Sequence, residues 1–395
     1  MDTSRRIAVD VAVLGAGIIG SSCAYHLARA GLKVALIDPV RPTAGSSGSC
    51  DGFLSVSTKA PGITMDLAVA SRALYPALVD ELGGGVDFER QDSMLVVEDA
   101  ADLPKIAAQV DKVRATGSDI AMIEPAALRT IEPSLSPDMA GAARTRGDFK
   151  VCPYLMTFAL ARGALASGAI ALWGERPQSF DIAGGAVRSV ATDRSVVSAE
   201  QFVFAAGVWS EGLGKLAGLR IPVVPRRGEL VVTDRLAAPP RHILVSAKYL
   251  TAKADPEAAR TSPDPLVRLG HGFVLETTAT GQCVIGSTRT FSGFERDSTA
   301  EGVGAIVSEA VKRVPALARA QVLRSFAGLR PFVPDKKPII GRSGRLANVI
   351  VATGHEGDGI TLAPITGALV ADLARARAPA LDIAALTPDR FAEAA

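Results

Sequence analysis

Three glycines near the start of the chain have the spacing of a dinucleotide-binding turn. Gly15, Gly17 and Gly20 (GAGIIG) follow an apolar run at 9–14 and open an amphipathic run at 18–30. In such a turn the first glycine permits the bend, the second admits a pyrophosphate, and the third lets the helix pack closely on the strand. The helix N-terminus then faces the phosphates. The spacing predicts a strand, a turn and a helix that bind a dinucleotide.

An acidic residue ends the next predicted strand. Residues 33–38 (KVALID) complete a βαβ pattern, and Asp38 follows Gly20 by 18 residues. An acid about 20 residues after the last glycine hydrogen-bonds the ribose hydroxyls of a dinucleotide. Strand, helix, second strand and acid therefore agree, although this fingerprint alone does not separate NAD from FAD.

Two later glycine turns favour FAD. The runs VFAAGVWS (203–210) and VIVATGHEGDGITLAPITG (349–367) each lead from an apolar strand into a glycine turn. A helix is predicted to begin directly after Gly359, and a helix N-terminus carries partial positive charge. Reduced flavin carries negative charge around its pyrimidine ring, whereas nicotinamide does not require such a partner.

The other elements place β-rich segments between α/β units. Helices are expected at about 64–82, 101–116, 154–167, 299–313 and 360–376, and strands at 86–97, 179–204 and 348–353. Short strands and turns at 222–295 are typical of an antiparallel sheet. The stretch 124–148, rich in Pro, Arg and Asp, is interpreted as a crossing between domains.

This order predicts an α/β (α+β) fold with two domains. One is a Rossmann-like FAD-binding domain with a parallel central sheet, and the other is a β-rich substrate domain with an antiparallel sheet. The FAD-binding domain is predicted to comprise residues 1–85, 147–222 and 328–395, and the substrate domain residues 86–146 and 223–327.

The composition argues against several other functions. Of 395 residues, 43 are Lys or Arg and 41 are Asp or Glu, so the net charge is +2, and the basic residues are scattered. Nucleic acid binding depends on a concentrated basic face and is not expected. The sequence contains no uninterrupted run of ~18 apolar residues, so no membrane span is predicted. Asp10 interrupts the N-terminal apolar stretch, which argues against a signal peptide.

The cysteines are too sparse for a metal centre. Cys23, Cys50, Cys152 and Cys283 lie far apart, with no CxxC pair and only four histidines in the chain. We therefore expect no metal site. Sparse cysteines are typical of a reducing compartment, so the cytoplasm is the expected location, with possible membrane association only through an electron-transfer partner.

Five motifs in order resemble one enzyme family. They are GAGIIG, SSGSCDG (46–52), AAGVWS (205–210), GLRPFVPDKKPIIG (328–341) and GHEGDGITLAPITG (354–367). Together they resemble the glycine oxidase and D-amino-acid oxidase superfamily of FAD-dependent amine oxidoreductases. With STKAPG, AKYL and GSTRTFSGF, the chain is most similar to the FAD subunits of D-hydroxyproline dehydrogenase, opine (octopine and nopaline) oxidase and hydrogen cyanide synthase.

The resemblance assigns roles to three residues. It implies that Arg330, in the GLRP motif, grips a substrate carboxylate, which suits a planar and permanently charged guanidinium. The alternative is that Arg330 ties strand ends to a neighbouring acid. Tyr249 would contact the carboxylate, wall the pocket, or be an ordinary packed tyrosine. His355 is interpreted as a flavin neighbour rather than a base.

The resemblance implies noncovalently bound FAD. The residues predicted to contact it are Gly15, Gly17, Ile18, Ile19, Asp38, Ser46, Ser47, Ser49, Cys50, Gly52, Phe180, Ala205, Ala206, Gly207, Trp209, Arg330, Gly354, His355, Gly357, Asp358, Gly359, Ile360 and Thr361. Arg226, Arg227 and Glu229 are interpreted as a solvated strand edge rather than pocket residues.

The segment after His355 departs from the family pattern. Glycine oxidase-like sequences continue with a Phe-Arg-Asn-type segment, whereas this chain has Glu356, Gly357 and Asp358. The change removes an expected pocket arginine and adds two acids. We therefore hypothesise a substrate with a secondary or basic amino group, as hydroxyproline and opines would present.

The resemblance also implies partners. The similar subunits belong to dehydrogenase complexes whose other chains carry iron–sulfur and further nucleotide sites, and this chain lacks the cysteines to hold such a cluster. The expected reaction is oxidation of the Cα–N bond of an amino acid to an imine that hydrolyses. The alternatives are a free-standing glycine, D-amino-acid or sarcosine-type oxidase using oxygen, a non-catalytic FAD relay subunit, and an NAD(P)-dependent dehydrogenase.

Overall fold

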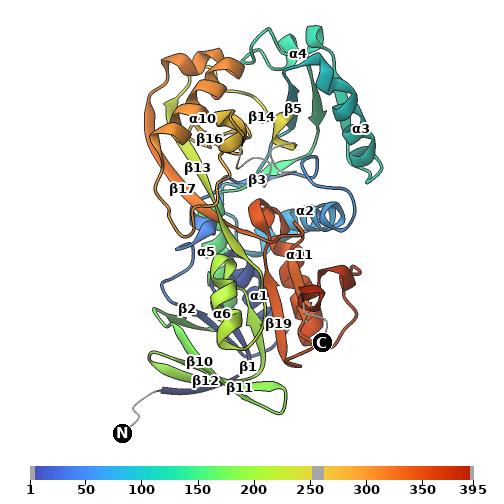
Figure 1. The fold of residues 1–395 in the computed structure, drawn as a ribbon. Coiled ribbons are helices and arrows are strands. Elements are labelled where there is room, and N and C mark those ends of the chain that lie inside the picture. The colour runs from blue at the N-terminus through green and yellow to red at the C-terminus, as the bar shows by residue number, and fades with distance from the viewer. Residues whose placement is uncertain (1–4, 251–261, 392–395) are drawn as a thin grey trace.

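The structure, a computed structural model, describes residues 5–250 and 262–391 and has two lobes, each built on its own large sheet (Figure 1). The first lobe contains both the N-terminal strand and the last long helix. The second lobe is built from the middle of the chain. Both lobes are continuous in space although each is assembled from separated segments of the sequence.

A mixed eight-stranded sheet forms the centre of the first lobe within the described residues. Five of its strands run parallel to one another: β1 (Arg5–Leu14), β2 (Val34–Asp38), β9 (Ile170–Trp173), β12 (Ser195–Phe204) and β19 (Val349–Thr353). Three antiparallel strands complete it: β10 (Pro177–Ala183), β11 (Ala186–Thr192) and β18 (Ile339–Arg342).

Helices and a hairpin cover the two faces of this sheet. Val11 and Val13 of β1 pack on the side of α1 (Ile18–Arg29), α2 (Ile63–Glu81), α5 (Pro153–Ala166) and α11 (Gly359–Ala374). Ala12 and Leu14 pack on the opposite side, with residues of α6 (Ser210–Leu216) and the β10–β11 hairpin. Because both faces are covered, the central strands are apolar throughout rather than alternating.

A second sheet, with eight strands in the part of the chain that the structure describes, forms the other lobe. Its order is β17 (Val322–Phe332), β13 (Val224–Arg235), β16 (Gln282–Gly286), β15 (Val274–Thr277), β14 (Ile243–Ser246), β5 (Ser93–Val97), β7 (Gly141–Thr145) and β6 (Ile120–Ile123). Neighbours are antiparallel except β14 and β5, which are parallel.

Shorter elements complete the chain. The second lobe contains the helices α3 (Leu103–Arg114), α4 (Pro125–Ile131), α9 (Pro265–Arg268) and α10 (Ala300–Arg313). A small sheet joins β3 (Phe53–Leu54), β8 (Phe149–Lys150) and β4 (Glu89–Arg90). Short 3-10 turns lie at Ser46–Gly48, Ala100–Asp102, Gly207–Trp209, Pro315–Arg319, Glu356–Asp358, Ala384–Leu386 and Pro388–Phe391. Among the described residues, none of the helices is long and apolar enough to cross a membrane.

The predicted α/β fold with a parallel and an antiparallel sheet is confirmed, with one local correction. The stretch 124–148 is not a simple crossing between domains, because it contains α4 and β7, and β7 pairs on both sides in the second sheet. The domain boundaries stay a prediction, and the one at 328 falls inside β17, which continues to Phe332.

Candidate active site

A cavity of about 620 Å³ extends between the two lobes and opens to solvent. Segments far apart in the sequence meet on its wall: the turn after β1, the loop from Asp38 to Phe53, residues 205–216, the Gly328–Pro331 part of β17, and residues 352–360. Gly228 and Leu230 of β13 and Tyr249, which follows β14 and lies outside the sheet, complete the wall. The cavity therefore joins the predicted dinucleotide turn to the predicted substrate sheet.

The glycine turn after β1 is too crowded for other residues. Gly15 has a φ of +109°, and a Cβ there would lie 2.4 Å from the carbonyl oxygen of Ala205. A Cβ on Gly20 would lie 1.8 Å from the carbonyl oxygen of Gly15. The close approach of β1 to β12, which pair in parallel up to Leu14 and Phe204, produces this crowding. The turn therefore exposes backbone at the cavity wall, as a phosphate cradle requires.

Asp38 stands beside this turn at the end of β2. Its Oδ2 accepts a hydrogen bond from the N–H of Ala16, and its Oδ1 accepts one from the N–H of Val40, both at 2.8 Å. Burial raises the pKa of Asp38, and these backbone N–H groups oppose the rise. The carboxyl group is thus fixed at the cavity wall, where the ribose of a dinucleotide is expected.

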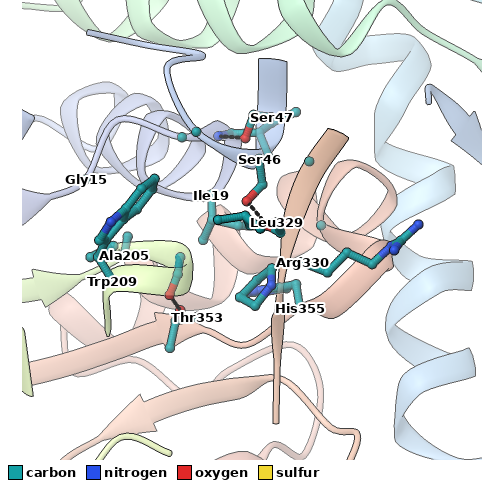
Figure 2. A pocket seen from close by; sticks show the side chains of 18 of the residues that line it. Gly15, Ile19, Ser46, Ser47, Ala205, Trp209, Leu329, Arg330, Thr353 and His355 are labelled. Atoms are coloured by element: carbon teal, nitrogen blue, oxygen red, sulfur yellow. Dashed lines mark hydrogen bonds between the residues drawn. The ribbon is translucent and has the colours of Figure 1, made fainter. Parts of the chain in front are cut away.

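The Ser46–Gly48 turn links the first helix to the second lobe. The hydroxyl of Ser47 accepts the N–H of Ile18 at 2.9 Å, in the first turn of α1. The hydroxyl of Ser46 donates to the carbonyl oxygen of Leu329 in β17 (Figure 2). This turn therefore fixes β17, and with it Arg330, relative to the glycine turn.

Arg330 and Trp209 lie toward opposite ends of the residues labelled in Figure 2. The guanidinium of Arg330 donates to the carbonyl oxygen of Thr288 at 2.9 Å and to the hydroxyl of Ser287 at 2.7 Å. A Cβ on Gly228, across the ladder, would lie 2.0 Å from Nη1 of Arg330, so glycine there makes room for the guanidinium. Both hydrogen bonds go to uncharged groups and hold a positive charge at the cavity wall.

His355 is buried at the cavity wall beside the start of α11. It is 3% exposed, and its Nε2 lies 3.0 Å from the hydroxyl of Thr366. Burial lowers the pKa of His355 to about 4. The imidazole is therefore neutral at pH 7 and is a weak proton acceptor, which agrees with a packing role beside the cofactor.

Tyr249 and Asp51 are further polar groups on the cavity wall. The guanidinium carbon of buried Arg289 lies 4.3 Å from the centre of the Tyr249 ring, a cation–π contact. Burial raises the pKa of Asp51, and the positive charge of Arg330 opposes the rise. Burial and the neighbouring Asp51 raise the pKa of Glu276, whose carboxylate accepts the N–H of Gly52.

The model of the DAO family, described as FAD dependent oxidoreductase, matches residues 10–373. The chain belongs to this family. The chain is similar to a hydrogen cyanide synthase subunit, HcnC, of Pseudomonas aeruginosa, with 28% identity over 97% of this chain and 96% of that protein. A glycine oxidase of Geobacillus kaustophilus is 30% identical over 95% of both chains. The crystal structure of glycine oxidase from Geobacillus kaustophilus superimposes with a TM-score of 0.87 at 26% identity, covering 98% of this chain and all of that one.

Membership in this family makes FAD the cofactor, and the cavity fits it. The Gly15 turn leaves the space that a pyrophosphate needs, and Asp38 lies where a ribose would be held. The first turn of α11, with Gly359 and Ile360 on the wall, directs a helix N-terminus at the same cavity. Among the described residues, no cluster of His, Cys, Asp or Glu could hold a metal ion.

Most of the predicted cofactor residues meet in this one cavity. They are Gly15, Gly17, Ile18, Ile19, Asp38, Ser46, Ser47, Ser49, Cys50, Ala205, Ala206, Gly207, Trp209, Arg330, Gly354, His355, Gly357, Gly359 and Ile360. Tyr249, predicted for the substrate side, also lines it. Their roles toward FAD and substrate stay predictions.

Four predicted cofactor residues do not line the cavity. Phe180, on β10, stacks on Phe204 of the first sheet with ring centres 5.3 Å apart. Gly52 donates its N–H to Glu276, and the Thr361 hydroxyl donates to a backbone carbonyl. Asp358 forms an ion pair with Lys59 at 2.7 Å, and both side chains are buried. Each of these groups is therefore engaged in packing or bonding away from the wall.

Arg226, Arg227 and Glu229 are not a solvated edge, so that interpretation is wrong. All three are buried. The rings of Phe291 and Phe332 pack on Arg226, and Arg227 donates to the carbonyl oxygen of Asp297. Glu229 accepts from the N–H and the hydroxyl of Thr299 at the start of α10, at 2.5 and 2.9 Å. The alternation of polar and apolar residues along one strand does not show which other segments pack around that strand.

Several cavity residues were not predicted. Arg176 and Pro177 follow β9, a short parallel neighbour of β2, and the carboxyl ends of parallel strands meet at one edge. Recognition of Ile170–Trp173 as a strand would have found them. Asp51 and Glu356 lie within motifs that the sequence did single out, but nothing local shows which side chains turn to the wall.

Proposed function

We propose that this protein oxidises the Cα–N bond of an amino acid or N-substituted amino acid, of the D-hydroxyproline or opine type. The product would be an imine that hydrolyses in water. The observation that carries the proposal is the position of Arg330, a cation at the wall of the cavity that also contains the dinucleotide turn. A carboxylate clamp beside an FAD site is what oxidation of an amino acid requires, whereas an electron relay has no use for one.

The residues of the chain act in this reaction by position. FAD, when bound, accepts the hydride that leaves Cα of the substrate. Arg330 would bind the carboxylate with the donors that its two protein hydrogen bonds leave free. Tyr249 would form the wall next to the substrate, and neutral His355 would pack beside the cofactor. Holding the substrate and FAD in the reactive orientation supplies much of the rate acceleration in such chemistry.

The electrons would pass to partner subunits. The support for this proposal is the similarity to HcnC, which is named as a subunit of hydrogen cyanide synthase. Such partners would carry the iron–sulfur and further nucleotide sites, and the complex would act in the cytoplasm. The similarity to glycine oxidase favours the second candidate, a stand-alone oxidase that uses oxygen.

Turnover by the purified chain tests the two candidates. The FAD-loaded protein is assayed with glycine, D-amino acids, D-hydroxyproline and opines, with oxygen or with an artificial dye as acceptor. We expect dye reduction with a secondary amine and little oxygen consumption. Equal rates with oxygen would support the stand-alone oxidase, and no turnover with either acceptor would contradict the proposed function.

A further inference from the structure

Glu356 is an acid of the cavity wall held in an unusual backbone conformation. Its φ is +50°, a region that residues other than glycine rarely adopt. Such a conformation persists only where the surrounding structure enforces it, and it is concentrated at functional sites. Glycine would fit this position without strain, so the glutamate side chain itself is the feature that requires an explanation.

Arg226 holds the carboxylate of Glu356 from behind the wall. Its Nη1 lies 3.4 Å from Oε1 of Glu356, and the Arg226 side chain is only 1% exposed. The guanidinium packs against both Phe291 and Phe332, at 5.5 and 5.3 Å from their ring centres. Burial lowers the pKa of Arg226 to about 10, which still leaves it charged at pH 7. The other oxygen, Oε2, accepts the N–H of Gly357 at 2.6 Å.

Arg330 stands next to this arrangement. Arg226 and Arg330 are direct partners in the β13–β17 ladder. A Cβ built on Gly357 would lie 3.4 Å from Nε of Arg330, so the segment that contains Glu356 passes against that guanidinium. A cation for a carboxylate and an anion for an ammonium group therefore occupy neighbouring positions on one wall.

Asp358, two residues further on, does not share this position. Its carboxylate pairs with the ammonium group of Lys59, and neither residue lines the cavity. Of the two acids that replace the family pattern after His355, only Glu356 presents a negative charge to the cavity wall.

We infer that Glu356 binds the positively charged amino group of the substrate while Arg330 binds its carboxylate. Arg226 is a positioning residue, which fixes the Glu356 carboxylate and does not touch the substrate. The inference rests on the proposed function and deepens it: the site selects zwitterionic secondary amines over analogues whose nitrogen is replaced by an uncharged atom.

Proline and tetrahydrofuran-2-carboxylate form the test pair, because they differ only by a charged NH₂⁺ group in place of an oxygen. With the FAD-loaded protein, the Kd of the oxygen analogue is measured from the change in flavin absorbance. The Kd of proline, in the enantiomer that reduces the flavin, comes from the concentration dependence of anaerobic reduction. We expect wild type to bind proline at least tenfold more tightly.

In Glu356→Gln this preference should fall about tenfold, while the Kd of the oxygen analogue changes less than threefold. Glu356→Gly is the second variant, because glycine suits a φ of +50° and removes the carboxylate without backbone strain, although buried Arg226 then loses its ion-pair partner and the Tm should fall. Glu295→Gln is the matched control, since Glu295 pairs with buried Arg227 at 3.8 Å but does not line the cavity. The control should keep the wild-type preference.

Arg226 is tested by a conservative rescue. Arg226→Met should lower the preference for proline as Glu356→Gln does, and Arg226→Lys should restore most of it, with bound FAD checked by absorbance. An unchanged preference in both Glu356 variants would overturn the inference and leave the proposed function intact. Flavin reduction by primary amines but not by proline would also overturn it. Reduction by no amine at all would contradict the proposed function itself.

Discussion

Arginine side chains of the second lobe occupy different depths around the cavity. Arg330 lines the cavity, whereas Arg226 lies behind Glu356 and Arg289 lies behind Tyr249. The depth decides the role: a guanidinium at the wall is available to a carboxylate of the substrate, and one behind the wall orients another side chain. The proposed recognition of an amino acid therefore depends on Arg330 for the carboxylate.

Replacement of Arg330 should separate substrate binding from cofactor binding. Arg330→Ala should keep FAD, because the glycine turn and Asp38 lie elsewhere on the wall. It should lower kcat/KM by ~30-fold or more, since loss of a buried charge partner costs about 2–5 kcal/mol and each 1.36 kcal/mol is tenfold. Arg330→Lys should recover only part of this, as an ammonium group lacks the planar fork. Near-normal kcat/KM in Arg330→Ala, measured by steady-state kinetics, would refute the assignment.

Local patterns predict individual residues only where the neighbours in sequence are also the neighbours in space. The glycine turn and Asp38 belong to one βαβ unit, so their spacing sufficed to predict that they lie together. Arg226 and Glu356 are 130 residues apart, and their contact depends on the β13–β17 ladder. The burial of Arg226 therefore could not be predicted from its own strand.

At the scale of elements, the packing of α1 against α11 positions the cofactor side of the cavity. The two helices cross closely at Gly367, where a Cβ would lie 2.4 Å from Oγ of Ser22 and 2.5 Å from Cδ2 of His26. The Ser22 hydroxyl donates to the carbonyl oxygen of Ala363 at 2.7 Å. Because α1 carries the phosphate turn and α11 begins at the cavity, this contact sets the distance between the two helix N-termini.

A methyl group at Gly367 should disturb this crossing. We expect Gly367→Ala to lower the free energy of unfolding by ~1–3 kcal/mol, the usual cost of overpacking, because the backbone oxygen of Ser22 at 2.7 Å cannot yield as a flexible side chain would. It should also weaken FAD binding. Gly304→Ala is the control, since Gly304 is exposed on α10, does not line the cavity, and would carry a Cβ that meets nothing within 4 Å. The free energy of unfolding of both variants is measured by urea denaturation, and equal values would contradict the account.

Long elements were easier to predict than short ones. The helices at 18–30, 64–82 and 299–313 agree with α1, α2 and α10 to within about two residues at most ends. Strand β9 was missed because it spans only four residues, and β7 because its sequence, GAART, lacks the apolar β-branched residues that marked the equally short β2 and β19. Their place is set by parallel or antiparallel partners that lie far away in the sequence.

At the scale of the whole molecule, the cavity lies where both lobes contribute to one wall. Segments from the first sheet and from β13 and β17 of the second sheet line it together. Arg296 reaches across and donates to the carbonyl oxygen of Ala44 at 3.2 Å. A dinucleotide bound here would contact segments from both lobes, so we expect the cofactor to stabilise the arrangement of the lobes.

Removal of FAD should therefore lower the stability of the entire chain. A ligand that binds only the folded state stabilises it by about 4.1 kcal/mol at 1,000 times its Kd. We expect the Tm of the apoprotein to lie well below that of the holoprotein and to rise with added FAD. Adding NAD is the control and should leave the Tm unchanged. A Tm independent of FAD concentration would show that the cofactor does not bridge the lobes.

The most direct test of the central claim is anaerobic mixing of the FAD-loaded protein with D-hydroxyproline and with an opine such as octopine, followed at the flavin absorption band near 450 nm. If the protein oxidises the Cα–N bond of an amino acid held by Arg330, at least one of these substrates bleaches the band within seconds, and Arg330→Ala slows the bleaching. A band that no amino acid or N-substituted amino acid bleaches would contradict the account.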